Sequence, residues 1–191
     1  MALKVSSGLT LNTDFFMRNF YKENRSAIKS SDRNNFSKIE LSFEDSRALS
    51  RAARRLMQND YGTSEDEDED VDETTRSSIE AFVKVYNNAL ATGKETTDRD
   101  TEHYLRQLKT LTKRNADDLA EIGITMEKDG SLSINDDLLK MADTSKVRKV
   151  FSDENDFTKT VWNIAKKLNV SVQNDIYGQV TGNGLRINIT M

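Results

Sequence analysis

Acidic side chains are the residues of this chain with the most obvious potential for chemistry. Adjacent pairs occur at Asp117-Asp118, Asp136-Asp137 and Asp153-Glu154. A glycosidase or a related hydrolase uses two carboxylates, one as acid and one as base or nucleophile, across a cleft. Each pair instead falls at an expected helix end or on a polar face, where the helix dipole favours acidic residues. The pairs therefore predict no catalytic residue, and a hydrolase that pairs two of these acids in a pocket is a third hypothesis.

The densest acidic stretch has eight acids and no base between residues 64 and 75. Asp66, Asp68 and Asp70 alternate as the ligands of an EF-hand do, but Val71 stands where the turn glycine is needed. No correctly spaced glutamate closes such a site. Residues 63–76 are therefore predicted to be an acidic loop or linker, with a cation site as the alternative.

Several residue types that enzymes and metalloproteins need are scarce or missing. The 191 residues include no cysteine, a single histidine (His103) and eight glycines, none of them in a phosphate-binding spacing. His103 lies off the apolar stripe of its expected helix, which predicts a surface position. We therefore predict a protein that is not an enzyme, with no cofactor, no metal and no small-molecule substrate.

Charge is distributed unevenly along the chain. Residues 1–63 carry a net charge of +4, yet the whole chain carries −4, and no nucleic-acid recognition motif follows the basic stripe. No apolar run approaches the roughly 18 residues that span a bilayer, and the first residues lack the apolar core of a secretory signal. We expect no nucleic-acid partner and no membrane insertion.

Helical spacing of apolar residues predicts the elements that would position any site. The absence of proline suits long helices, and the expected fold is a mainly α, elongated antiparallel helix bundle. Residues 1–62 are predicted to be an N-terminal helical segment that packs on the body, with one helix capped by Thr13 and a second that begins at Ser42. Their apolar stripes exceed what one small core needs, so we predict that they contact partner subunits. The candidate interaction residues are Ala48, Leu49, Ala52, Leu56, Phe16 and Phe20.

Residues 77–175 are predicted to be a helical body with a β-hairpin. One helix should end at Gly93, and the next should run from near Thr97 to Gly123. Alternating residues around Asp129-Gly130 predict a hairpin at 124–134. A second glycine turn makes residues 176–191 a tail or a terminal hairpin at 176–190. The expected core residues are Phe82, Tyr86, Leu108, Leu111, Leu119 and Trp162.

The body also resembles a known family. Residues 78–87 (SIEAFVKVYN) are similar to the "fV..YN" helix of the flagellar filament-cap protein, the flagellin-polymerisation protein. Residues 119–139 resemble that family's "L..iGI....dG.L.id...L" signature, and residues 147–151 its "v..lF" continuation. The resemblance implies a helical stalk of D1 type with a small hairpin, part of a cap at the filament tip.

For function, the resemblance implies a non-enzymatic structural protein that self-assembles through its helices. Its expected partners are itself and other flagellar axial proteins, and its expected location is the extracellular flagellum, reached by flagellar export without a cleaved signal peptide. Residues 63–76 offer only an acidic loop where that family inserts large β-rich domains, which suggests a reduced relative. The alternative is an intracellular, cytoplasmic helical adaptor or chaperone-like module that docks charged partners.

Overall fold

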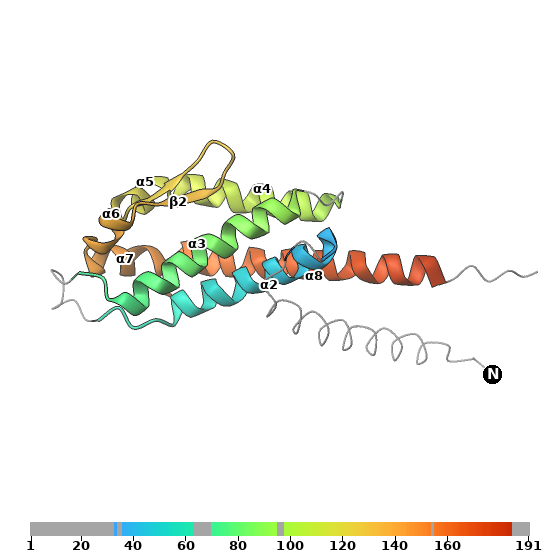
Figure 1. Ribbon diagram of the computed structural model, residues 1–191, viewed down its shortest axis with the longest axis horizontal. Helices are drawn as coiled ribbons and strands as arrows, with labels where there is room; N and C mark the ends of the chain where they lie inside the picture. The colour runs from blue at the N-terminus through green and yellow to red at the C-terminus, as the bar shows by residue number, and fades with distance from the viewer. Residues whose placement is uncertain (1–32, 34–35, 63–69, 95–97, 154, 185–191) are drawn as a thin grey trace, which may run out of the picture.

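The computed structural model describes residues 33, 36–62, 70–94, 98–153 and 155–184, with side chains up to residue 178. Within these ranges the chain is a helix bundle with one small antiparallel hairpin, which confirms the predicted fold class. Figure 1 shows that the bundle is elongated. The helix predicted after Thr13, with Phe16 and Phe20, lies outside the described residues. In chain order the elements are α2 (Lys38–Met57), α3 (Glu73–Gly93), α4 (Arg99–Arg114), α5 (Ala116–Glu121), β1 (Ile124–Met126), β2 (Leu132–Ile134), α6 (Asp136–Lys140), α7 (Thr144–Phe151) and α8 (Asp156–Gly184).

Helix α2 begins before the predicted start at Ser42. Ser37 and Glu40 form a capping box, in which the Ser37 N–H donates to Glu40 Oε2 at 2.8 Å and Ser37 Oγ accepts from the Glu40 N–H at 3.4 Å. This reciprocal pair satisfies donors that a helix start otherwise leaves unpaired. Ser42 therefore lies inside the helix, where it is buried.

Helix α3 begins inside the stretch predicted to be an acidic loop, which corrects the end of that loop. Asp72 caps it, accepting from the N–H groups of Thr74 at 2.7 Å and Thr75 at 2.9 Å. Hydrogen bonds from Thr75, side chain first and backbone second, hold the pKa of Asp72 below its ordinary value. The last acids of the run thus start a helix, while residues 63–69 lie outside the described ranges.

The single helix predicted from Thr97 to Gly123 is two helices, α4 and α5. They meet at Asn115, whose Nδ2 donates to the Leu111 carbonyl at 2.8 Å. The same carbonyl also accepts from the Asn115 N–H at 3.3 Å, so Asn115 is bonded to the last turn of α4 through both its backbone and its side chain. Gly123 follows α5 with φ 79°, as predicted for a glycine that terminates a helix.

The predicted hairpin at 124–134 is confirmed, with Ile124 opposite Ile134 and Met126 opposite Leu132. Its connection is longer than a two-residue turn. The Glu127 carbonyl accepts from the Gly130 N–H at 3.0 Å, and the Glu127 N–H donates to the Ser131 carbonyl at 2.8 Å. Gly130 has φ 93°, so it is the left-handed residue of a three-residue connection.

Among the described residues three glycines have positive φ, and two of them, Gly123 and Gly130, allow a matched test. A Cβ on Gly123 would lie 2.9 Å from the Leu139 backbone nitrogen, whereas the atoms nearest to a Cβ on Gly130 belong to the flexible Lys109 side chain. We expect Gly123→Ala to lower the free energy of unfolding by about 3 kcal/mol and Gly130→Ala by about 1 kcal/mol. Urea denaturation of both variants measures the difference. Equal losses would mean that the backbone near Gly123 moves freely to admit a methyl group.

Helix α3 holds the hairpin through one asparagine. Asn87 Nδ2 donates to the Leu132 carbonyl at 2.7 Å, and Asn87 Oδ1 accepts from the Leu132 N–H at 2.8 Å. The side-chain amide thus pairs with β2 as another strand would, on residues 45 positions away in the sequence. An isolated two-stranded hairpin is marginally stable in water, so this pair fixes the hairpin on the bundle.

Removal of this pair should loosen the hairpin. We expect Asn87→Ala to lower the free energy of unfolding by about 2 kcal/mol, because two hydrogen bonds to a partly buried backbone are lost. Hydrogen exchange should also become faster at the Leu132 amide. The control is Asn88→Ala on the same helix, expected within about 0.5 kcal/mol of the parent chain. A similar loss in both variants would contradict a specific role for Asn87.

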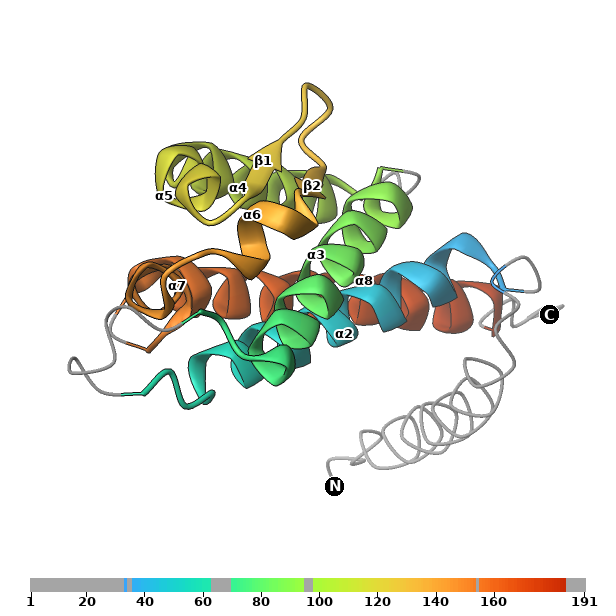
Figure 2. The ribbon, with the colours of Figure 1, turned by 60° about the vertical axis from the view of Figure 1, so that its left-hand side comes forward.

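The main core contains buried residues from every described helix and from both strands. Phe82 stands at its centre, with its ring centroid 5.7 Å from that of Phe151 and 6.5 Å from that of Phe157. In both views α2 and α8 run side by side, and α3 lies between α2 and the hairpin (Figures 1 and 2). Of the residues predicted for the core, four are buried and two are partly buried. The buried ones are Phe82, Tyr86, Leu108 and Leu119; the partly buried ones are Leu111 and Trp162.

Helix α8 is continuous through Gly184, which overturns the terminal hairpin predicted at 176–190 as far as the described residues reach. Val172 and Ile176, one helical turn apart, are buried against Phe43 of α2 in a second, smaller core. In the helix, residues four positions apart share one face, so both side chains pack on Phe43, and this packing prevails over the glycines that suggested a turn. Within the described ranges, none of the helices is both long and apolar enough to cross a membrane.

Candidate interaction surfaces

The residues with potential for chemistry are dispersed over the described surface. His103 is exposed as predicted, and its Nε2 lies 2.8 Å from Gln107 Nε2. Asp118 forms an ion pair with Lys149 at 2.8 Å, and Asp136 and Asp137 are exposed at the start of α6. Among the described residues, no group of three or more metal-ligating side chains gathers. The chain as described thus brings none of the predicted acid pairs into a shared cleft.

Three hollows on the described surface each contain at most one carboxylate. A hollow of about 460 Å³ on α7 and the start of α8 contains Arg148, Lys149 and one carboxylate, that of Asp156. A second, between α4 and α8, also has one carboxylate, that of Asp100. The third, on α2, has none. Since general acid–base catalysis by paired carboxylates needs two facing acids, none of these three hollows offers the pair that such a hydrolase needs.

The interaction residues predicted on α2 are placed differently than expected. Leu49 and Leu56 are fully buried in the core of the chain itself, so their prediction as partner contacts is corrected. Ala48 and Ala52 are partly buried. The physical reason is that α2 is covered on two sides, by α3 and α8, which uses the whole apolar stripe internally. Phe16 and Phe20 lie outside the described residues.

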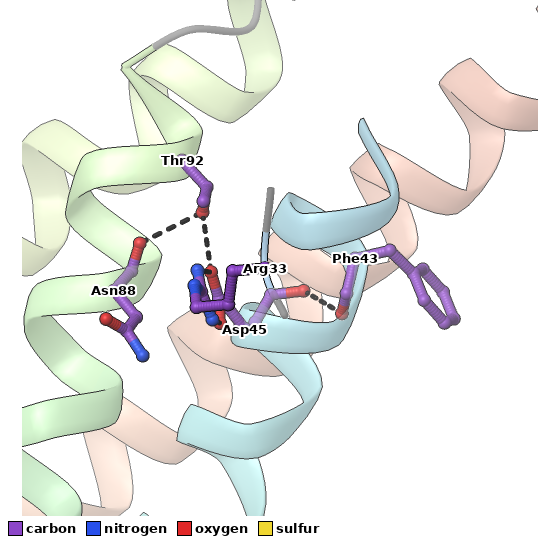
Figure 3. Close-up of polar contacts among 6 residues, drawn as sticks. Arg33, Phe43, Asp45, Asn88 and Thr92 are labelled. Carbon is purple, nitrogen blue, oxygen red and sulfur yellow. Dashed lines mark hydrogen bonds and ion pairs between the residues drawn. The ribbon is translucent and has the colours of Figure 1, made fainter. Parts of the chain in front are cut away.

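A buried carboxylate links the start of the described chain to the bundle. Asp45 of α2 is 4% exposed and accepts from both terminal nitrogens of Arg33, at 2.9 and 2.6 Å. Thr92 of α3 donates to the same carboxylate at 3.1 Å and to the Asn88 carbonyl at 3.0 Å (Figure 3). A bidentate arginine pair fixes direction as well as distance. The pair therefore fastens Arg33 to the interface between α2 and α3.

Large apolar side chains are exposed at few points of the described surface. Leu138 is 53% exposed and Met141 73% exposed, one helical turn apart on and just after α6. Leu139 between them is fully buried and holds α6 on the bundle. We name Leu138 and Met141 the α6 knob. A helix of five residues is too short to bury every side.

A third exposed apolar residue, Val170 at 53%, lies on α8 beside a hollow of about 270 Å³. We name this hollow, between α4 and α8, the α4–α8 groove. Lys166 Nζ lies 4.5 Å from the ring centroid of Trp162, an interaction that holds the ammonium near the groove. The lining residues are Asp100, Tyr104, Lys166, Lys167, Val170, Ser171 and Asn174. The groove thus combines apolar surface with a cationic rim.

The walls of this groove are fixed to one another. Asp98 caps α4 by accepting from the Thr101 N–H at 2.8 Å, and it also accepts from the Ser171 hydroxyl of α8 at 2.7 Å. Burial acts to raise the pKa of Asp98, but the bonds from Ser171 and Thr101 oppose it and leave the pKa below its ordinary value. The carboxylate therefore stays charged at neutral pH and keeps α4 against α8.

A cationic surface covers the second half of α2. Arg51, Arg54 and Arg55 are exposed and line a shallow hollow of about 540 Å³ with Gln58 and Asn59. The last two arginines also suit the negative end of the helix dipole. A surface of this kind attracts acidic partners and does no chemistry by itself.

Comparison with known proteins adds no relative: no family model, no curated protein and no solved structure matches this chain. Three described surfaces are suited to contact with other macromolecules: the α6 knob, the α4–α8 groove, and the arginine patch of α2, formed by Arg51, Arg54 and Arg55.

Proposed function

We propose that this chain is a non-enzymatic structural protein of flagellar filament-cap type. It would leave the cell by flagellar export and self-assemble through helix packing at the filament, with itself and other axial proteins as partners. The proposal rests on the sequence resemblance, and the fold of the resembling segments supports it.

The supporting observation is that the three resembling segments form one connected unit. They lie on α3, on the α5–hairpin–α6 region and on α7, and each contributes fully buried residues to the main core. The first two segments are also joined directly, since Asn87 ends the "fV..YN" helix motif and pairs with Leu132 of the hairpin motif. Residues that resemble a family and also depend on one another in the fold are better evidence than scattered matches.

The second candidate function is an intracellular helical adaptor. The observation that favours it is the arginine patch of α2, whose Arg51, Arg54 and Arg55 face solvent. An acidic protein partner would be attracted to this patch, with an association rate that falls as salt screens the charges. The two candidates differ in where the protein is found.

Localisation in the native organism therefore tests the proposal. Antibody against the protein would be applied to cells, sheared filaments and culture medium, from the parent strain and from a strain without flagellar export. We expect the protein in filaments or medium of the parent strain alone. Retention in the cytosol of both strains would contradict the cap-type proposal and favour the adaptor. A cytosolic enzyme serves as the control for lysis.

A further inference from the structure

We propose that the α6 knob of one copy of this chain docks in the α4–α8 groove of a second copy. This inference rests on the self-assembly of the proposed function and names the surfaces that would carry it. Both surfaces belong to the described chain, and together they hold all three of its most exposed large apolar residues: Leu138, Met141 and Val170.

The volume of the groove suits the side chains of the knob. The groove, at about 270 Å³, is smaller than the roughly 300–1,000 Å³ of typical small-molecule sites. It has the volume of several water molecules of about 30 Å³ each, enough for one or two aliphatic side chains. Met141 is the most exposed of the three residues, at 73%, and methionine adapts its shape to irregular surfaces. Its burial against Tyr104 and Val170 would remove apolar area from water on both copies.

The charges around the two surfaces are complementary. Asp136 and Asp137 precede the knob and are exposed, while Lys166 and Lys167 line the groove. Opposite charges stand on each side as well: Lys140 and Arg76 near the aspartates of the knob, Asp100 in the groove, and Asp98 bonded to the groove residue Ser171. Docking with the aspartates toward the lysines therefore pairs acid with base, which favours this orientation over others.

The knob cannot reach the groove of its own chain. Helix α6 is fixed by the buried Leu139 and lies at the end of the bundle beside α7, at the left in Figure 1. On α8 the groove residues lie 10 to 18 positions after Asp156, the first residue of that helix. This separation is about 15–27 Å along the axis of α8. Docking must therefore join two copies, and because the two surfaces differ, it can repeat from copy to copy into a ring or a filament.

Site-specific cross-linking tests this pairing. Because the chain has no native cysteine, only the introduced thiols react. One full-length chain would carry Met141→Cys and a second, distinguished by a tag, Val170→Cys. The two would be mixed and treated with a short bifunctional maleimide. We expect the mixed dimer to form at least about tenfold faster than by random collision, because docking raises the effective concentration of the thiols. Salt at about 1 M should slow the cross-linking reaction, since it shortens the screening length of the charges to about 3 Å.

The matched control replaces Val170→Cys with Arg54→Cys, an exposed position outside both surfaces. A mixed dimer no faster than with this control would overturn the proposal. Rapid self-pairing of the Met141→Cys chain would overturn it too, because that result requires knob against knob.

Charge reversal provides a second readout on the same cross-link. Lys166→Glu with Lys167→Glu on the groove chain should return the rate to the control level. Asp136→Lys with Asp137→Lys on the knob chain should then restore it. The matched charge change Arg54→Glu with Arg55→Glu should leave the rate unchanged. An unaltered rate in the groove variant, or no recovery with the reciprocal pair, would contradict the proposed orientation.

Failure here is distinguishable from failure of the proposed function. Cross-linking uses purified chains and reports only which surfaces meet, whereas localisation reports whether the protein is exported. A protein found in filaments without this cross-link would keep the cap-type proposal and lose the knob-in-groove contact. A cytosolic protein that forms the cross-link would keep the knob-in-groove contact and lose the cap-type proposal.

Discussion

Leu49→Asp is expected to unfold the protein or to lower its free energy of unfolding by more than about 5 kcal/mol. Leu49 is fully buried among α2, α3 and α8. The substitution removes the packing of a core leucine, worth about 2–5 kcal/mol, and places a carboxyl group where nothing pairs with it, at a further cost of several kcal/mol. Since domains of ordinary stability have about 5–15 kcal/mol in total, most of the stability is lost.

Circular dichroism during thermal and urea denaturation measures this effect. Gln58→Asp is the matched control, because it also turns a neutral residue into an acid, at the exposed C-cap of the same helix. That change should stay within about 0.5 kcal/mol of the parent chain. A folded Leu49→Asp chain with parental stability and a smaller oligomer would instead place Leu49 at an interface between copies.

Phe82→Ala should lower the free energy of unfolding by about 4 kcal/mol, within the range for buried phenylalanines. The ring packs edge-on against Phe151 and Phe157 and lies 6.2 Å from Tyr86, centroid to centroid. Its removal leaves a cavity between α3, α7 and α8, with elements on three sides that cannot all close inward. For a chain of this length each kcal/mol shifts the melting temperature by about 2–4 °C, so a fall of roughly 8–16 °C is expected.

Phe82→Leu separates the loss of volume from any change in chemistry. It keeps most of the apolar volume, and we expect a loss of only about 1–1.5 kcal/mol. Differential scanning calorimetry of both variants gives the comparison. If alanine and leucine at position 82 cost the same, the aromatic cluster would not be a tightly packed part of the core.

Tyr86 shows how a core residue can also keep a polar partner. Its hydroxyl lies 2.9 Å from Thr112 Oγ1, and burial raises its pKa to about 12 although the bond to Thr112 acts in the opposite direction. The tyrosine is therefore neutral throughout the physiological range. Its hydrogen bond joins α3 to α4 inside the core, where an unpaired hydroxyl would be costly.

Local patterns in the sequence were enough to predict several features of the fold. Helical spacing placed Phe82, Tyr86 and Leu119 in the core, and Gly123 and Gly130 marked a helix end and a turn. These signals are local because a helix face repeats within a few residues and a positive φ favours glycine wherever it occurs. The predicted start of α2 at Ser42 was wrong for a similarly local reason, since Ser37 and Glu40 form a better cap.

Which apolar surfaces stay exposed depends on packing between segments that are far apart in the sequence. The stripe with Leu49 and Leu56 suggested a partner site, but α3 and α8 cover it. The residues that remain exposed, Leu138, Met141 and Val170, carry no distinctive pattern in the sequence. The end of α8 was likewise fixed by contact, because Val172 and Ile176 meet Phe43 from the other end of the described chain. Burial depends on what packs against a segment from far away in the sequence, and periodicity within a segment contains no record of that partner.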